Sequence, residues 1–242
     1  MNTSETLQKM KELRLYGMYE TYENYLKSLN SSELSLDELI GLLIDTETTY
    51  RENRKTERLL KNAKFRYNAT MEEIDYSASR QLDKSQLLRL YSCDYIKQGE
   101  NIIITGATGS GKSYIASALG NKACEKGYKV MYYNLLKLME KMKILQADLR
   151  DVKEKERISR HELLILDDFG LKELNTEERL LLLEILEDRH GIRSTVITSQ
   201  LPVEKWYEMI GDSTIADAIL DRLIHSSRRI EIKGESKRKK AK

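Results

Sequence analysis

The first part of the chain carries apolar residues at the spacing typical of helices rather than at the alternation typical of strands. Between residues 5 and 29 they recur every three or four positions, at Leu7, Met10, Leu13, Leu15, Met18, Tyr22, Tyr25, Leu26 and Leu29. After Ser35, a residue suited to a helix N-cap, the same spacing runs from Leu36 to Lys64. We therefore predict a small all-helical N-terminal module over residues 1–65, built from two helices packed as a hairpin.

From Asn101 onward the pattern changes to short apolar runs rich in β-branched residues, separated by amphipathic segments. The runs are Ile102–Thr105, Lys129–Tyr133, Leu163–Leu166 and Ser194–Thr198. Buried strands that alternate with helices predict an α/β fold, a parallel sheet flanked by helices on both faces. We place this domain at residues 101–232, after a connecting segment at residues 66–100 and before a basic tail at residues 233–242.

The composition shows two local clusters of basic residues, but it does not by itself show whether they bind nucleic acid. The 242 residues are 40% hydrophobic and 33% charged, as in a globular chain, and the net charge is only +2. The charge is unevenly spread: residues 51–66 hold seven basic and two acidic side chains, and residues 228–242 hold eight and two. Such islands either contact phosphate backbones or form solvated helix faces and tails.

The sequence also bears on the compartment. Residues 1–20 lack the apolar core of a signal peptide, and no apolar run approaches the roughly 20 residues that a membrane helix needs. We expect a cytoplasmic protein with no membrane partner. Cys93 and Cys124 show no C-x-x-C spacing, so we expect buried free thiols rather than a zinc site.

The strongest chemical signal is a Walker A loop directly after the first predicted strand. It consists of Gly106, Ala107, Thr108, Gly109, Ser110, Gly111, Lys112 and Ser113, and Tyr114 follows it. In this G-x-x-x-x-G-K-S pattern the glycines let backbone amides surround phosphates, at the N-terminus of the next helix. Lys112 is expected to reach the β- and γ-phosphates and the Ser113 hydroxyl to bind magnesium. The sequence therefore predicts ATP and Mg²⁺ as cofactors.

Two carboxylates follow the apolar run Leu163–Leu166. Such residues could be no more than a helix cap and turn, but their distance from the loop, with strands between and after, favours a Walker B strand. Asp167 is then expected to hold magnesium through its water shell, and Asp168 to activate the attacking water as general base.

Three further positions are candidates for contacts with the γ-phosphate. Ser199 and Gln200 end the run that begins at Ser194, although polar residues at a strand end are often turn residues. Arg222, near the end of an amphipathic segment, suits an arginine finger supplied to a neighbouring subunit, or else a salt bridge with Asp217 or Asp221.

Four stretches of the chain together resemble a known family. They read GATGSGKSYIASALG, LLILDDFG, TSQLPVEKWYEMIGDSTIADAILDRLIH and GESKRK. They are similar to the IstB-type helper ATPases of bacterial insertion sequences, which are AAA+ P-loop NTPases related to DnaC-type helicase loaders and DnaA-type initiators. The resemblance covers residues 60 to 240, and its most specific part runs from Ser199 to Arg238.

The resemblance implies a function that residue spacing does not. Proteins of this type bind double-stranded DNA with little sequence preference, assemble as ATP-bound homo-oligomers and help a transposase of the same element capture target DNA. It further implies that Arg222 acts in trans and that Arg238 is a sensor-like residue.

Candidate DNA contacts are implied in two places. In this clade an extra helix after the second strand contacts DNA, and the matching stretch contains Lys137, Lys141 and Lys143, which equally suit an exposed helix face. The basic island of the helical module adds four more: Arg51, Arg54, Lys55 and Arg58.

Two other functions remain open at this stage. A DnaC-like helicase loader would share the ATPase core but act on single-stranded DNA and a replicative helicase. A P-loop kinase would transfer phosphate to a small molecule, which the paired aspartates and the basic tail argue against. We expect a switch, in which ATP stabilises a DNA-bound oligomer and hydrolysis releases it.

Overall fold

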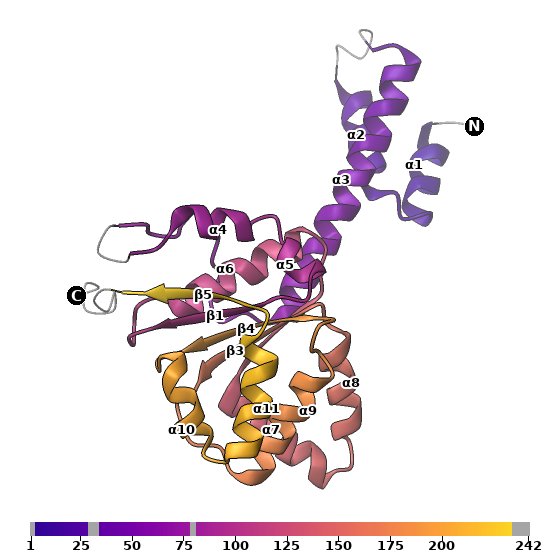
Figure 1. The fold of residues 1–242 in the computed structure, drawn as a ribbon. Helices are drawn as coiled ribbons and strands as arrows, with labels where there is room; N and C mark the ends of the chain where they lie inside the picture. The colour runs from indigo at the N-terminus through magenta and orange to yellow at the C-terminus, as the bar shows by residue number, and fades with distance from the viewer. Residues whose placement is uncertain (1–2, 29–33, 78–80, 234–242) are drawn as a thin grey trace, which may run out of the picture. The chain divides into compact units, whose positions relative to one another are not determined.

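The computed structural model describes residues 3–28, 34–77 and 81–233 (Figure 1). Arg238, one of the predicted site residues, lies outside the described part. The chain divides into two compact units, Met1–Arg58 and Leu59–Lys242, whereas the sequence suggested a boundary after residue 65.

The N-terminal unit contains α1 (Thr3–Glu12), α2 (Tyr16–Lys27) and the first part of α3 (Leu36–Ala63). The prediction of a single helix between residues 5 and 29 was wrong, because the backbone turns at Arg14, whose φ of 58° is left-handed. Side-chain periodicity continues through this turn and therefore concealed it.

A polar contact fixes the start of α2. The buried Glu47 carboxylate on α3 accepts hydrogen bonds from the backbone N–H groups of Gly17 and Met18, at 2.8 and 3.2 Å. These N–H groups at a helix N-terminus have no partner within the helix, and a carboxylate there is also favoured by the helix dipole. Only glycine fits at position 17, because a Cβ would lie 2.6 Å from the Thr46 carbonyl oxygen.

The second unit is built on a five-stranded sheet in which every pairing is parallel. In chain order the strands are β1 (Asn101–Gly106), β2 (Val130–Asn134), β3 (Leu163–Phe169), β4 (Ser194–Ser199) and β5 (Ser227–Ile232). Their spatial order is β2-β3-β4-β1-β5, so all the strands end at one edge of the sheet. Four strands were predicted, and β5, whose exposed arginines and glutamate hide the pattern, was missed.

Alternate residues of β1 to β4 enter two separate cores, whereas β5 contributes to only one of them. Ile102 and Ile104 belong to the core on one face, with α4 (Lys84–Leu90), α5 (Asp94–Lys97) and α6 (Lys112–Glu125). Ile103 belongs to the core on the other face. That face is covered by α7 (Leu135–Ala147), α8 (Asp151–Arg160), α9 (Thr176–Glu187), α10 (Trp206–Ile210) and α11 (Ser213–Ile224).

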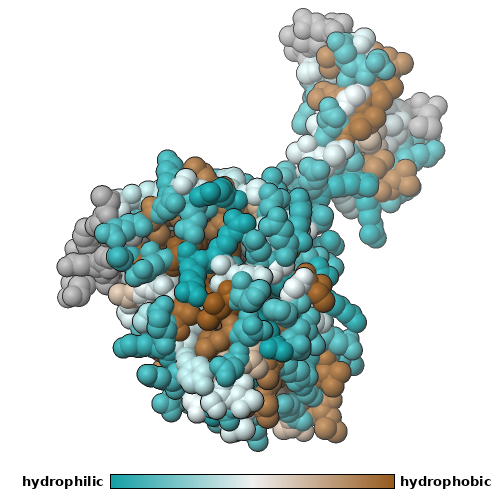
Figure 2. All heavy atoms as spheres, in the orientation of Figure 1, coloured by the Kyte–Doolittle hydropathy of each residue, from teal (hydrophilic) through white to brown (hydrophobic). Residues whose placement is uncertain are grey.

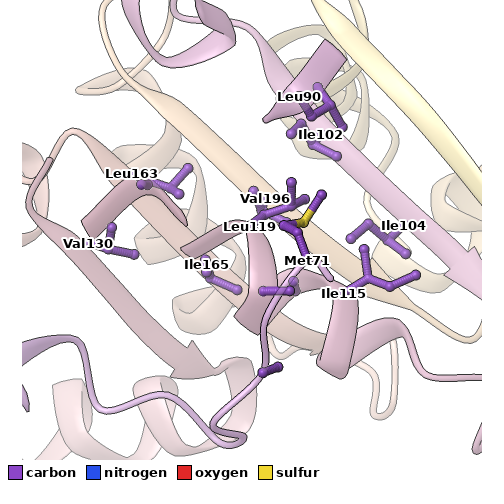
Figure 3. Close-up of a cluster of buried hydrophobic side chains, with 14 of the residues drawn as sticks. Met71, Leu90, Ile102, Ile104, Ile115, Leu119, Val130, Leu163, Ile165 and Val196 are labelled. Carbon is purple, nitrogen blue, oxygen red and sulfur yellow. The ribbon is translucent and has the colours of Figure 1, made fainter. Parts of the chain in front are cut away.

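The segment expected to connect the two domains contributes to the first of these cores. Figure 3 shows Met71 and Leu90 among the side chains of β1 and α6, including Ile104 and Leu119. Met71 is 5% exposed and Leu90 is 1% exposed. The described residues of this segment, 66–77 and 81–100, are therefore a structural layer over the sheet.

The two cysteines are free and buried, as predicted. Burial raises the pKa of Cys93 to about 11 and that of Cys124 to about 12. No helix in the described residues is long and apolar enough to cross a membrane.

Candidate nucleotide-binding site

The loop between β1 and α6 has the curled backbone that its glycines permit. Gly111, with φ of 95°, lies in the left-handed region just before the first turn of α6. At Gly106 a Cβ would lie 2.5 Å from the Ile232 carbonyl oxygen of the neighbouring β5. The loop can thus pass close to β5 without a steric clash.

Lys112 lies inside this curl. Its ammonium donates hydrogen bonds to the carbonyl oxygens of Gly106 and Ala107, at 2.8 and 2.9 Å, and the residue is 6% exposed. The structure therefore holds a positive charge inside the curl of the loop, beside the cavity. That arrangement suits the oxygens of a polyphosphate.

Asp167 is the most buried charged group of the site, with no exposed surface. One carboxylate oxygen accepts from the hydroxyl of Ser113 at 2.8 Å and from that of Thr198, and the other accepts from the Tyr132 phenol. Burial and this bond raise the pKa of Tyr132, so its hydroxyl stays protonated and remains a donor. Ser113 and Asp167 together offer the oxygen ligands that Mg²⁺ prefers, so these residues fit the metal.

Asp168 projects from a local break in the sheet. The pairing of β3 with β4 shifts register between Leu166 and Phe169, and Asp168 has a left-handed φ of 64°. Its backbone N–H donates to the Thr198 hydroxyl at 3.1 Å, and its carboxylate accepts from the Asn134 amide at 2.9 Å. This bulge directs the second carboxylate into the cavity, where a water could be activated.

The cavity above the loop has a volume of about 510 Å³, within the range of small-ligand sites. On one side it is lined by the predicted residues Thr108, Gly109, Gly111, Lys112, Ser113, Tyr114, Asp168 and Gln200. On the other it is lined by residues from the segment before α4, namely Arg66, Tyr67, Glu73, Ile74 and Asp75. A phosphate-binding loop beside an aromatic and apolar wall fits ATP. No sequence pattern predicted the second set, because these residues lie far from the motifs along the chain.

Tyr114 and Tyr67 form the aromatic part of this wall. Their ring centroids lie 6.2 Å apart, and the Tyr114 hydroxyl donates to Glu73 at 2.5 Å. The Glu73 hydrogen bond is the first cause of the raised pKa of Tyr114. Tyr114, which was predicted to belong to the cofactor site, thus contacts two residues of the segment that was predicted only to connect the domains.

Of the two residues proposed at the end of the fourth strand, the structure brings only Gln200 to the cavity. Its side-chain oxygen accepts from the Thr108 hydroxyl at 2.7 Å. Ser199 is fully buried and donates to the Phe169 carbonyl oxygen at 2.8 Å, so its hydroxyl stabilises the turn instead. Thr198, which was not predicted as a site residue, contacts both aspartates from the end of β4: its hydroxyl donates to Asp167 and accepts from the Asp168 backbone N–H.

Arg66 bridges the two carboxylates. Its Nη1 lies 3.3 Å from Asp167 Oδ2 and 3.3 Å from Asp168 Oδ2. The Tyr67 ring lies 5.5 Å from the guanidinium carbon. No sequence motif predicted Arg66 as a site residue, because it is 101 positions from Asp167 in the sequence.

Arg222 is not among the cavity-lining residues. At the end of α11 its guanidinium pairs with Glu187 of α9 and lies 3.9 Å from Asp221, one of the two partners foreseen. Its backbone carbonyl accepts from the Asn101 side chain at 2.8 Å, which attaches this helix end to β1. The position lies outside the loop's own cavity.

Some of the candidate DNA-binding residues already form ion pairs within the chain, and others are exposed. Lys141 donates to Glu154 at 2.8 Å and to the Tyr133 hydroxyl at 2.9 Å, so it stabilises α7 against α8. Arg51 pairs with Glu47 at 2.6 Å. The remaining candidates are exposed: Lys137 and Lys143 on α7, and Arg54, Lys55 and Arg58 on α3.

The chain is similar to known proteins over nearly its whole length. The model of the family described as IstB-like ATP binding protein matches residues 8–242. A putative insertion sequence ATP-binding protein of Sinorhizobium fredii is 43% identical over 234 residues, which are 97% of this chain and 96% of that protein. The insertion sequence IS21 putative ATP-binding protein of Pseudomonas aeruginosa is 31% identical over 233 residues, 96% of this chain and 88% of that protein.

Solved structures resemble it in fold. The DnaC helicase loader superposes with a TM-score of 0.58 at 20% identity, covering 69% of this chain and 98% of that one. The AMPPCP-bound DnaA of Aquifex aeolicus superposes with a TM-score of 0.57 at 18% identity, covering 70% and 51%. The predicted α/β fold of the AAA+ type, with additional N-terminal helices, is therefore confirmed.

Proposed function

The chain belongs to the IstB-like ATP binding protein family and is an AAA+ ATPase, and from this premise we propose that it serves a transposase as an ATP-dependent, DNA-binding helper. The observation that supports the site is that Lys112, Ser113 and Asp168 line one cavity, with the buried Asp167 hydrogen-bonded to Ser113 behind its wall. The relatives carry insertion-sequence names, which supports a partner transposase from the same element.

In the proposed site each residue has one task. Lys112 binds the β- and γ-phosphates, and Ser113 and Asp167 hold Mg²⁺. Asp168 accepts the proton of the attacking water. The bound metal supplies charge neutralisation on the phosphates. Asn134 and Thr198 orient Asp168 through its carboxylate and its backbone N–H.

Oligomerisation is proposed from the position of Arg222. The residue lies outside its own cavity, at a helix end attached to the sheet by Asn101, so its natural target is the γ-phosphate bound by a second copy. In this arrangement the Glu187 carboxylate is its resting partner. A homo-oligomer assembled by ATP then hydrolyses ATP faster as subunits associate.

Duplex DNA binding is proposed from charge. A protein that accepts any sequence contacts phosphates rather than base edges, and exposed lysines and arginines suffice for that. The exposed residues Lys137 and Lys143 are preferred over Lys141, whose ammonium is already committed to Glu154. Repetition of a modest patch in an oligomer gives high avidity from a nearly neutral subunit.

The test is binding to labelled duplex and single-stranded DNA of equal length, with ATP, with ADP and with the Lys112→Ala variant. The proposal predicts tight duplex binding only for the unaltered protein with ATP, weakened by salt. Preference for single strands would favour a helicase-loader-like function, and binding independent of nucleotide would contradict the switch.

A further inference from the structure

Arg66 is the group of the site that the proposed function leaves without a task. It lies beside the two carboxylates that, under the proposed function on which this inference rests, serve Mg²⁺ and the attacking water. One nitrogen, Nη1, lies 3.3 Å from an oxygen of each aspartate. A single cationic group therefore already neutralises part of the charge that a metal would neutralise.

The Asp167 carboxylate does not have enough acceptor positions to serve Arg66 and Mg²⁺ at the same time. An ionised carboxylate offers about four acceptor positions. Four donors contact Asp167: Ser113 and Thr198 on one oxygen, and Tyr132 and Arg66 on the other. Mg²⁺ usually keeps several of its waters, and those waters need acceptors. One protein donor must therefore leave before Asp167 can serve the metal.

Arg66 is the donor best placed to leave. Thr198 is fully buried and Tyr132 is 8% exposed, so water cannot easily replace Asp167 as their hydrogen-bond partner, and leaving either hydroxyl unpaired would cost free energy. Ser113 is itself an expected metal ligand. The Arg66 side chain is 40% exposed, and its guanidinium stays charged and solvated after leaving.

The backbone on both sides of Arg66 is anchored, so only its side chain needs to move. Phe65 packs against Gly120, where no Cβ would fit, and its ring lies 6.3 Å from that of Tyr132. On the other side Tyr67 packs against Tyr114. The change is a rotation of one long side chain within a fixed frame.

We propose that Arg66 is a positioning residue that competes with Mg²⁺ for Asp167 and Asp168. In one state its guanidinium holds the two carboxylates together. In the other the metal takes them and the guanidinium turns away. This competition raises the magnesium concentration that the carboxylates require, so the metal binds well only when nucleotide phosphates supply further ligands.

The experiment is a magnesium titration of the full chain at a fixed concentration of fluorescent, non-hydrolysable ATP analogue. For Arg66→Ala we expect the magnesium midpoint to fall about five- to tenfold, a modest share of the strength of a close charge pair near a surface. Arg66→Lys keeps the charge but places it on a compact ammonium with a different reach, so its midpoint should lie between the two. Lys64→Ala removes a nearby exposed charge and should leave the midpoint unchanged.

Thermal unfolding without nucleotide gives a second readout. Magnesium alone should raise the midpoint temperature of Arg66→Ala more than that of the unaltered protein. If Arg66→Ala and the unaltered protein have equal magnesium midpoints in the analogue titration, the inference is overturned. Weaker analogue binding by Arg66→Ala at every magnesium concentration would overturn it too, because Arg66 would then be a phosphate ligand. If the unaltered protein binds no analogue at any magnesium concentration, the proposed nucleotide site itself is wrong.

Discussion

The two units bury side chains in different ways. All the buried hydrophobic side chains of the described residues come from Leu59 onward, whereas before it the buried residues are Gly17 and Glu47. On α3 the apolar residues Leu36 and Ile44 are 75% and 50% exposed, and Figure 2 shows hydrophobic residues at the surface of the helical unit. The second unit is a packed scaffold that can fix catalytic groups. In the first unit α2 and α3 are joined by the hydrogen bonds to the buried Glu47 carboxylate and by the contact of the Tyr16 and Tyr50 rings.

This difference predicts that substitutions act within one unit. Changes at the edge of the sheet should alter nucleotide chemistry and leave the N-terminal helices intact. Changes at the contact between α2 and α3 should do the reverse. The expected effects below run from the largest to the smallest.

Lys112→Ala should weaken ATP binding about a hundredfold or more, since a charged hydrogen-bond donor to phosphate is lost. Helix content by circular dichroism should not change. Titration with a fluorescent ATP analogue measures the affinity, and Lys126→Ala, at an exposed lysine that ends the same helix, is the control. Equal losses in both variants would mean that the loop lysine has no special role.

Asp168→Asn should lower the rate of ATP hydrolysis about a hundredfold, the usual share of a general base, with nucleotide affinity retained. The amide keeps the size of the side chain but cannot accept a proton. Phosphate release and analogue binding, measured on the same sample, separate the two effects. Unchanged hydrolysis would remove Asp168 from the mechanism.

Gly17→Ala should destabilise the N-terminal unit by about 1–3 kcal/mol, because the added Cβ would overlap the α3 backbone. Gly41→Ala is the matched control: a Cβ there meets nothing within 4 Å, and alanine should stabilise helix α3 by up to about 1 kcal/mol. Thermal unfolding followed by circular dichroism measures both. A large loss of ATP affinity in Gly17→Ala would show that the units do not respond separately.

The two thiols should show the smallest effect. Their pKa values of about 11 and about 12 lie above the ordinary range, so raising the pH from 7 to 9 leaves both in the thiol form. Reaction with a disulfide reagent should stay slow over this range and become fast once the protein unfolds. Rapid labelling of the folded protein at pH 8 would contradict the burial of this core.

What the sequence could predict depended on how local the signal was. The loop at Lys112 and the carboxylates after Leu166 lie next to strands with strong apolar runs, so both fold class and candidate site followed from pattern. Asn134 and Thr198 contact the aspartates because the sheet brings distant strand ends together, and Arg66 does so because the segment after α3 lies beside that edge of the sheet. Contacts between residues so far apart leave no periodic pattern in the sequence. For the same reason Ser199, and not Thr198, was predicted as a site residue.

Breaks in regular structure were also hidden. The left-handed turn at Arg14 interrupts no hydrophobic period, and the bulge at Asp168 leaves the sequence of β3 unremarkable. The roles of Arg222 and of the basic residues on α3 and α7 stay predictions, because each depends on a partner molecule. The role of Arg238 also stays a prediction, because it lies outside the described residues.

The most direct test of the central claim, that one copy completes the ATP site of another, is a mixing experiment with Arg222→Ala and Lys112→Ala. The first variant binds ATP but lacks the finger, and the second offers the finger but cannot bind ATP. Each alone should hydrolyse ATP very slowly, and a mixture with duplex DNA present should recover a clear fraction of the unaltered rate. No recovery at any ratio, with both variants folded, would contradict the account.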